Sequence, residues 1–98
     1  MGLQFIGEVG VYMRDRDAVK ILAADGDRII ECYVQRSALD AVGCPGPEEG
    51  AEFIRYFQEH RATFEIAAMV KYRRALKRPV ELQIDARDLA AVLPASAA

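Results

Sequence analysis

The sequence contains few of the side chains on which enzymes rely for nucleophilic or metal chemistry. Its 98 residues include two cysteines, one histidine, two serines and one threonine. Neither a GxSxG nucleophile elbow nor a cysteine–histidine pairing motif is present. The phosphate-binding P-loop and the GxGxxG turn are also missing, since Gly7 and Gly10 do not open a clear βα unit. We therefore predict no catalytic residue, no cofactor and no metal site, and we expect a protein that is not an enzyme.

Long apolar runs and a charge excess of one sign are missing too. No stretch reaches the roughly 18 apolar residues that cross a bilayer. Residues 1–6 lack a basic n-region and a long apolar h-region, so we expect no signal peptide and no membrane partner. With 13 basic and 15 acidic side chains the net charge is −2, which argues against a general nucleic-acid coat protein. A local basic patch stays compatible with that balance.

The two cysteines do not form a recognisable pair. Cys32 and Cys44 fit neither a CxxC redox motif nor a zinc-knuckle pattern. Cys32 lies in a strand-like run, where cysteine behaves as a small core residue. Cys44 lies in a loop rich in glycine and proline. We expect no disulfide, because the chain reads as a cytoplasmic protein.

The apolar content is high enough for one folded domain. Apolar residues make up 52% of the chain. We expect a single domain over residues 1–98, with a core at about 18–89 and a frayed tail at 94–98. A domain of this size hides only about 60–65% of its unfolded surface, so association with further copies would raise its stability.

A β-hairpin is the clearest local signal. Residues 18–24 alternate, with Val19, Ile21 and Ala23 on one face. Gly26 supplies the positive φ of a tight turn, and residues 28–35 alternate as the return strand. Residues 9–13 are compatible with a further edge strand, and the charged residues 14–17 with a solvated connection.

Two helices are predicted after the hairpin. Residues 36–42 form a short helix that Gly43 is placed to end, and residues 44–47 form a connector. A long helix then runs from Pro47 to about Leu76, with proline at its first position. Its core stripe consists of Phe53, Phe57, Phe64, Ala68 and Ala75.

The second half of the long helix is apolar on almost every side. Ile66, Met69 and Val70 lie nearly opposite the core stripe. A helix of this kind needs burial on more than one side. The remaining cover must come from the short helix, the C-terminal segment or another subunit, so these three residues are the candidate oligomer interface.

The C-terminal part predicts a further strand and a short helix. In residues 80–84, Val80, Leu82 and Ile84 alternate as inward positions. Asp85 is placed to cap a helix, with Asp88 three residues on. The predicted fold class is therefore α+β, with two layers: an antiparallel sheet of three to four strands, one long helix across a face, and short helices.

A basic cluster ends the long helix and is the candidate anion or nucleic-acid contact. It consists of Lys71, Arg73, Arg74, Lys77 and Arg78. Cations here also complement the negative end of the helix dipole, and both interpretations stay open. Only Tyr72 lies within the cluster, which gives base stacking little support. Arg61 and Glu65 are four apart and are expected to pair, while His60 is expected to be a surface or packing residue.

A set of dispersed features carries a family resemblance. They are the Asp25-Gly26 turn, Ile30 and Cys32 on the return strand, Ala38-Leu39 on the short helix, the 80–84 strand, and Phe57, Arg61, Ile66, Ala67 and Tyr72 on the long helix. In this order they resemble a small bacterial family known as domain of unknown function 1488, over roughly residues 19–89. The resemblance implies a compact α+β domain and brings no catalytic residue. Such sequences favour a capping serine at the start of the short helix, where this chain has Gln35 and Arg36.

Two functions compete on these observations. The first is a non-enzymatic interaction or regulatory module that forms a homodimer or binds another protein through Ile66, Met69 and Val70. The alternative is a nucleic-acid or phosphate-ligand binder that uses the basic cluster. Nothing in the sequence identifies the ligand, the partner or the biological process.

Overall fold

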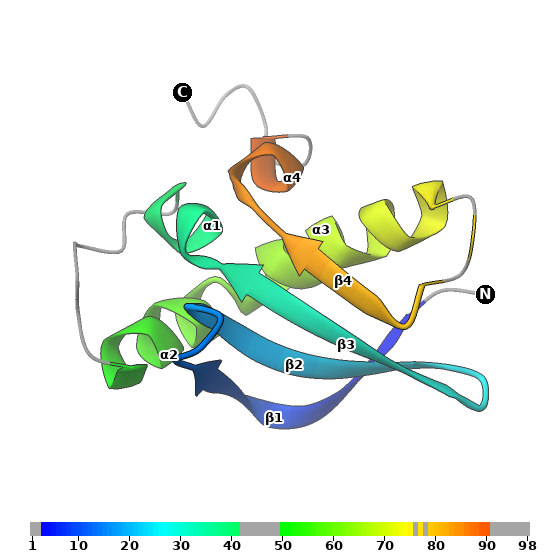
Figure 1. Ribbon diagram of the computed structural model, residues 1–98, viewed down its shortest axis with the longest axis horizontal. Coiled ribbons are helices and arrows are strands. Elements are labelled where there is room, and N and C mark those ends of the chain that lie inside the picture. The colour runs from blue at the N-terminus through cyan, green and yellow to red at the C-terminus, as the bar shows by residue number, and fades with distance from the viewer. Residues whose placement is uncertain (1–2, 42–49, 76, 78, 91–98) are drawn as a thin grey trace.

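A four-stranded sheet and four helices make up the described part of the chain (Figure 1). The computed structural model describes residues 3–41, 50–75, 77 and 79–90. In chain order the elements are β1 (Gln4–Met13), β2 (Ala18–Asp25), β3 (Arg28–Gln35), α1 (Arg36–Ala41), α2 (Gly50–Glu59), α3 (Arg61–Arg74), β4 (Glu81–Ile84) and α4 (Ala86–Ala90). The predicted α+β class is confirmed. The predicted connector at 44–47, the tail at 94–98, Cys44 and Arg78 lie outside the described residues.

The predicted hairpin is confirmed in position and in register. β2 and β3 pair antiparallel from Ala18 opposite Gln35 to Asp25 opposite Arg28. Gly26 has φ +64°, the left-handed conformation that the turn requires. The predicted inward residues Val19, Ile21 and Ala23 are buried. Alternation and turn chemistry were therefore sufficient to determine this unit.

The sheet is mixed, which corrects the prediction of a wholly antiparallel sheet. Its strand order is β1-β2-β3-β4, and β4 pairs parallel to β3 with Cys32 opposite Leu82. Helices α1, α2 and α3 separate the two strands and return the chain along the sheet, as a parallel neighbour requires. Leu82 and Ile84 face the core as predicted, but Val80 precedes the strand and is 60% exposed.

The predicted single long helix is wrong, because it is divided at His60 into α2 and α3. His60 has φ −116° and ψ 20°, and its carbonyl accepts hydrogen bonds from the amides of Thr63 and Phe64. An unbroken helix over residues 47–76 would be about 45 Å long, whereas the largest extent of the fold is 36 Å. The division lets α2 contact β1 and β2 while α3 contacts β4 and α4.

One core lies between the sheet and the helices. Its largest fully buried side chains are Phe53, Phe57, Phe64, Ile30, Leu39, Ile84, Leu89, Val19, Val34 and Cys32. Phe57 of α2 and Phe64 of α3 stack with ring centroids 5.5 Å apart, so the aromatic stripe stays continuous across the division. In Figure 1, α2 and α3 lie behind the sheet, and none of the described helices covers the face toward the viewer.

The start of α4 forms the predicted cap. The Asp85 carboxylate accepts hydrogen bonds from the amides of Arg87 and Asp88, at 3.0 and 3.2 Å. In return, the Asp88 carboxylate accepts one from the Asp85 amide at 2.9 Å. The two aspartates thus satisfy the free amides at both sides of the helix start, in the manner of a capping box.

Candidate interaction surface

The side of the sheet that none of the described helices covers carries a concentration of exposed apolar side chains. We call this side the open face. Because successive residues of a strand point to opposite sides, the partners of the buried residues point outward here. Among the described residues the exposed large apolar side chains are Ile6, Val11, Leu22, Ile29, Ile66 and Val80. The first four lie on the open face, on β1, β2 and β3.

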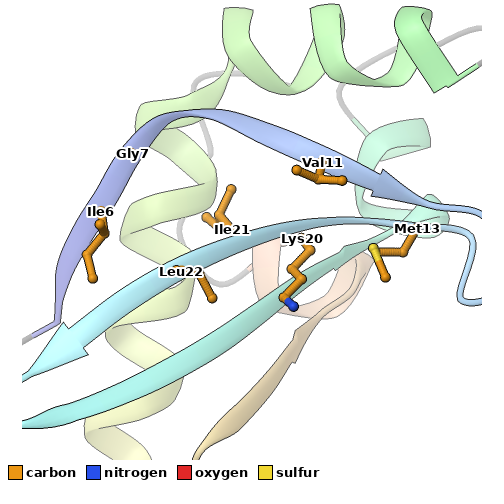
Figure 2. A pocket seen from close by; sticks show the side chains of 7 residues that line it. All are labelled: Ile6, Gly7, Val11, Met13, Lys20, Ile21 and Leu22. Carbon is orange, nitrogen blue, oxygen red and sulfur yellow. The ribbon is translucent and has the colours of Figure 1, made fainter.

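A distortion of β1 shapes this face. Ile6 stands opposite Leu22 and Val11 stands opposite Lys20, so residues 7–10 of β1 correspond to Ile21 alone on β2. We call residues 7–10 the β1 arch. Gly7 has φ +83°, a conformation that few residues other than glycine adopt. Extra residues on one strand of an antiparallel pair bend that strand away from its neighbour, as Figure 2 shows.

The arch stays in place because it is attached to the helix layer. Arg61 Nη2 donates a hydrogen bond to the Gly7 carbonyl at 2.8 Å. The same guanidinium is oriented by Glu65, with Nε–Oε2 at 2.7 Å, which confirms the predicted pair. Gly10, at the other end of the arch, is buried against Val19 and Phe57. Arg61 therefore fixes one end of the arch and close packing fixes the other.

The arch opens a hollow on the open face (Figure 2). Its volume is about 330 Å³, and it is lined by Ile6, Gly7, Val11, Met13, Lys20, Ile21 and Leu22. Lys20 is the one charged residue among these seven. Its ammonium lies 3.9 Å from a carboxylate oxygen of Glu31, at the long limit of an ion pair. The hollow is thus an apolar depression with a cation at its rim.

Beyond the hollow, toward β4, the open face becomes polar. The Arg16 guanidinium lies 4.2 Å from the centre of the Tyr33 ring and 3.3 Å from Glu81. The Tyr33 hydroxyl donates to Glu31 at 2.8 Å, and this hydrogen bond raises the pKa of Tyr33. The open face therefore has an apolar half on β1 and β2 and a rim that carries both signs of charge.

The predicted oligomer interface on α3 is smaller in the structure than its helical pattern indicated. Ile66 is 50% exposed, Met69 is partly buried against the core, and Val70 is half-buried. Of the three side chains, only Ile66 is thus exposed over half of its surface. Their role as an interface stays a prediction.

The predicted basic cluster is divided between two environments. Lys71 Nζ donates to the Gln83 carbonyl and forms an ion pair with Asp88 at 3.0 Å, so it joins α3 to β4 and α4. Arg73, Arg74 and Lys77 are exposed at the end of α3. Anion binding by these residues stays a prediction.

Cys32 and His60 lie where they contribute to the packing of the fold. Cys32 is fully buried, and burial raises the pKa of its thiol to about 12, which makes it a poor nucleophile. His60 Nδ1 lies 3.0 Å from the Tyr56 carbonyl at the junction of α2 and α3. The described residues contain no group of three or more side chains placed to hold a metal ion.

The charged turn before β2 proved to be more than a solvated connection. Asp17 has φ +51° and accepts from Arg36 Nε at 2.5 Å and from the Tyr12 hydroxyl at 2.7 Å. The hydrogen bonds from Arg36 hold the pKa of Asp17 below its usual value. Arg36 also lies 4.6 Å from the centre of the Phe53 ring. Arg36 therefore joins the turn to α2 from the start of α1, a role that no local pattern indicated.

Residues of the hollow were also missed by sequence reasoning. Two glycines, Gly7 and Gly10, interrupt a strand-like segment, and glycine inside a strand is typical of a bulge or a close backbone approach. That signal was present in the sequence. The sequence contained no signal for the position of Lys20 beside the hollow, because that position depends on the register of β1 against β2.

The fold and this surface define a small α+β module with a mixed sheet and one open face. A family model described as "Protein of unknown function (DUF1488)" matches residues 3–82, so the chain belongs to the DUF1488 family and the resemblance is confirmed. Its fold is similar to the crystal structure of a DUF1488 family protein from Shewanella loihica PV-4. The TM-score is 0.70 at 15% identity, covering 85% of this chain and 91% of that one. This likeness shows a shared fold and no activity.

None of the curated proteins compared with this chain matches it. The helices within the described residues are all too short or too polar to cross a bilayer.

Proposed function

We propose that this DUF1488 protein is a bacterial, cytoplasmic interaction module that forms a homodimer through its open face. The observation that carries the proposal is the placement of Ile6, Val11, Leu22 and Ile29 together on the uncovered side of the sheet. Apolar side chains gathered on one face favour a partner surface, because burial removes them from water. The Shewanella relative supports a bacterial origin.

Charge complementarity favours a second copy as the partner. Lys20 and Glu31 lie side by side on the open face, and Arg16 and Glu81 form a second mixed pair. A two-fold axis through such a surface turns one copy relative to the other, so that positive groups can meet negative groups. Two sheets packed face to face also bury their apolar positions efficiently. A domain of 98 residues gains stability from such burial.

The hollow supports binding rather than catalysis. A group-transfer or hydrolytic reaction needs a nucleophile or a paired acid and base within hydrogen-bond distance of the substrate. The side chains that line the hollow include one ionisable group, Lys20. Apolar contact is therefore the main interaction that this surface offers.

Sedimentation equilibrium tests the proposal. Val11→Lys and Ile29→Lys place a charge at positions that are 58% and 51% exposed, so the fold itself is expected to tolerate them. Each should raise the dimer dissociation constant by about tenfold or more, because the lysine places an unpaired charge in the apolar contact between the copies. Ile66→Lys is the matched control at 50% exposure on α3, and it should leave the constant unchanged.

Two results would contradict the proposal. A parent protein that stays monomeric at millimolar concentration has no homodimer to explain. If Ile66→Lys dissociates the dimer while Val11→Lys does not, the interface lies on α3, as the helical pattern alone predicted.

Anion binding at the end of α3 is a second candidate function. The observation that favours it is that Arg73, Arg74 and Lys77 are exposed together there. Contacts to phosphates weaken steeply with salt. Charge reversal at Arg73 and Arg74 should therefore abolish retention on heparin at low salt, and unchanged retention would eliminate this candidate.

A further inference from the structure

The hollow has the dimensions of a small-molecule site. Its volume of about 330 Å³ lies at the lower end of the range for ligand pockets. A water-sized group takes up roughly 30 Å³, so the hollow holds about ten non-hydrogen atoms. In Figure 2 the side chains of Ile6, Val11 and Ile21 lie beside the gap that the β1 arch leaves next to β2, and those of Lys20 and Leu22 extend from β2 on the side away from the arch.

The lining has the chemistry of a site for an amphipathic anion. Ile6, Val11, Met13 and Leu22 supply apolar walls, and Lys20 supplies one cation at the rim. We propose that the hollow binds an organic carboxylate of about ten non-hydrogen atoms in all, most of which form an apolar body. The hydrocarbon lies on the apolar walls and the carboxylate meets the Lys20 ammonium, which provides three donors.

Glu31 competes with such a ligand for Lys20. The Glu31 carboxylate lies 3.9 Å from the ammonium and is held by the Tyr33 hydroxyl at 2.8 Å. At that distance the ion pair is long, and Lys20 keeps donors for a second acceptor. The Glu31 charge nevertheless repels an incoming carboxylate. Removal of the Glu31 charge should therefore raise the affinity of the hollow for an anion. A purely apolar site would show no such increase.

The hollow is formed before any ligand arrives. Arg61 holds the Gly7 carbonyl at 2.8 Å, and Gly10 is packed against the buried Val19. A site that is already formed does not need to order its walls on binding. Because the hollow is wide open on one side, we expect dissociation constants in the millimolar range.

The inference rests on the proposed function in one respect only. The hollow lies inside the surface that a second copy is proposed to cover, so a bound carboxylate should compete with dimerisation. Binding itself does not require a dimer, and it is to be measured at a protein concentration at which sedimentation of the same sample shows monomer.

The test is a titration with octanoate, which has about ten non-hydrogen atoms, followed by amide chemical shifts of β1 and β2. Octanamide is the matched neutral ligand. Lys20→Met should weaken octanoate binding about two- to fivefold, the range of an exposed ion pair, and Glu31→Gln should strengthen it by a similar factor. Octanamide should respond to neither change. Lys77→Met removes an exposed cation elsewhere and should leave octanoate binding unchanged.

Two outcomes would overturn the inference: no saturable shift in the β1 and β2 amides, or octanoate affinity that is the same in the parent, Lys20→Met and Glu31→Gln. Sedimentation of the same samples separates this failure from that of the proposed function. Octanoate binding by a chain that never dimerises refutes the homodimer alone. A chain that dimerises at high concentration, but whose monomer does not bind octanoate at low concentration, refutes the carboxylate site alone.

Discussion

Gly10 should not tolerate even a single added carbon atom. A Cβ built there would lie 2.6 Å from Val19 Cγ1, 3.3 Å from Ile21 Cγ2 and 3.4 Å from Phe57 Cδ2. The first distance is far below van der Waals contact. Val19 and Phe57 are fully buried, so neither side chain has free space into which it can move. Gly10→Ala must therefore displace the end of the β1 arch or the buried core beside it.

The expected loss of stability follows from two opposing effects. Overpacking of a buried site costs about 1–3 kcal/mol. Replacing glycine by alanine restricts the unfolded chain, which returns about 0.4–1 kcal/mol. We expect Gly10→Ala to lower the free energy of unfolding by about 1–2 kcal/mol, as measured by urea unfolding monitored by circular dichroism.

A double-mutant cycle with Val19→Ala tests the steric reason directly. Val19→Ala alone removes buried apolar volume and should cost about 2–3 kcal/mol. In the double variant the new methyl group occupies the space that Val19 vacated. The combined loss should therefore be smaller than the sum by about 1–2 kcal/mol. A Gly10→Ala protein as stable as its parent, or strictly additive losses, would refute this reasoning.

Three further predictions concern the contacts around the sheet. Arg61→Ala removes the hydrogen bond to the Gly7 carbonyl and should lower the free energy of unfolding by about 1 kcal/mol. Amide hydrogen exchange should become faster in the β1 arch alone. Unchanged exchange there would contradict the attachment of the arch by Arg61. Because Arg36 lowers the folded pKa of Asp17, the ion pair stabilises the protein above pH about 4 and is lost as the pH falls through that lowered pKa. Asp17→Asn should therefore be less stable by about 0.5–1 kcal/mol at pH 7 and equal to the parent at the acid end of a series of thermal melts. Cys32, with its thiol pKa raised to about 12, should resist iodoacetamide in the native protein and react after unfolding in urea, as peptide mass spectrometry would show.

Features that depend on a few neighbouring residues were predictable from the sequence. Alternation determined which side of β2 is buried, and Gly26 determined the turn that follows it. The Asp85 cap needed only two carboxylates three residues apart. In each case the interacting groups lie close together in the chain, so the local backbone conformation already brings them into contact.

The division of the long helix could not be predicted in this way. The aromatic stripe of Phe53, Phe57 and Phe64 continues through His60 without a change of period, so the pattern predicted one helix. Its three phenylalanines are buried, as the pattern required, whereas Ala75 at the end of the predicted stripe is exposed. What the pattern lacked was the size of the whole fold, whose largest extent of 36 Å is shorter than a single helix over residues 47–76 would be.

Only the tertiary structure decided where the open face and its hollow lie. The sequence by itself determined the α+β class, the β2–β3 hairpin, the capped α4 and the Arg61–Glu65 pair. The sequence also showed two glycines in a strand-like segment, Gly7 and Gly10, but it did not show which residues contact them in the fold. Arg61 reaches the Gly7 carbonyl across 54 positions of the chain, and the direction of β4 depends on three intervening helices. Contacts over such separations depend on the packing of whole elements, which no short sequence pattern encodes.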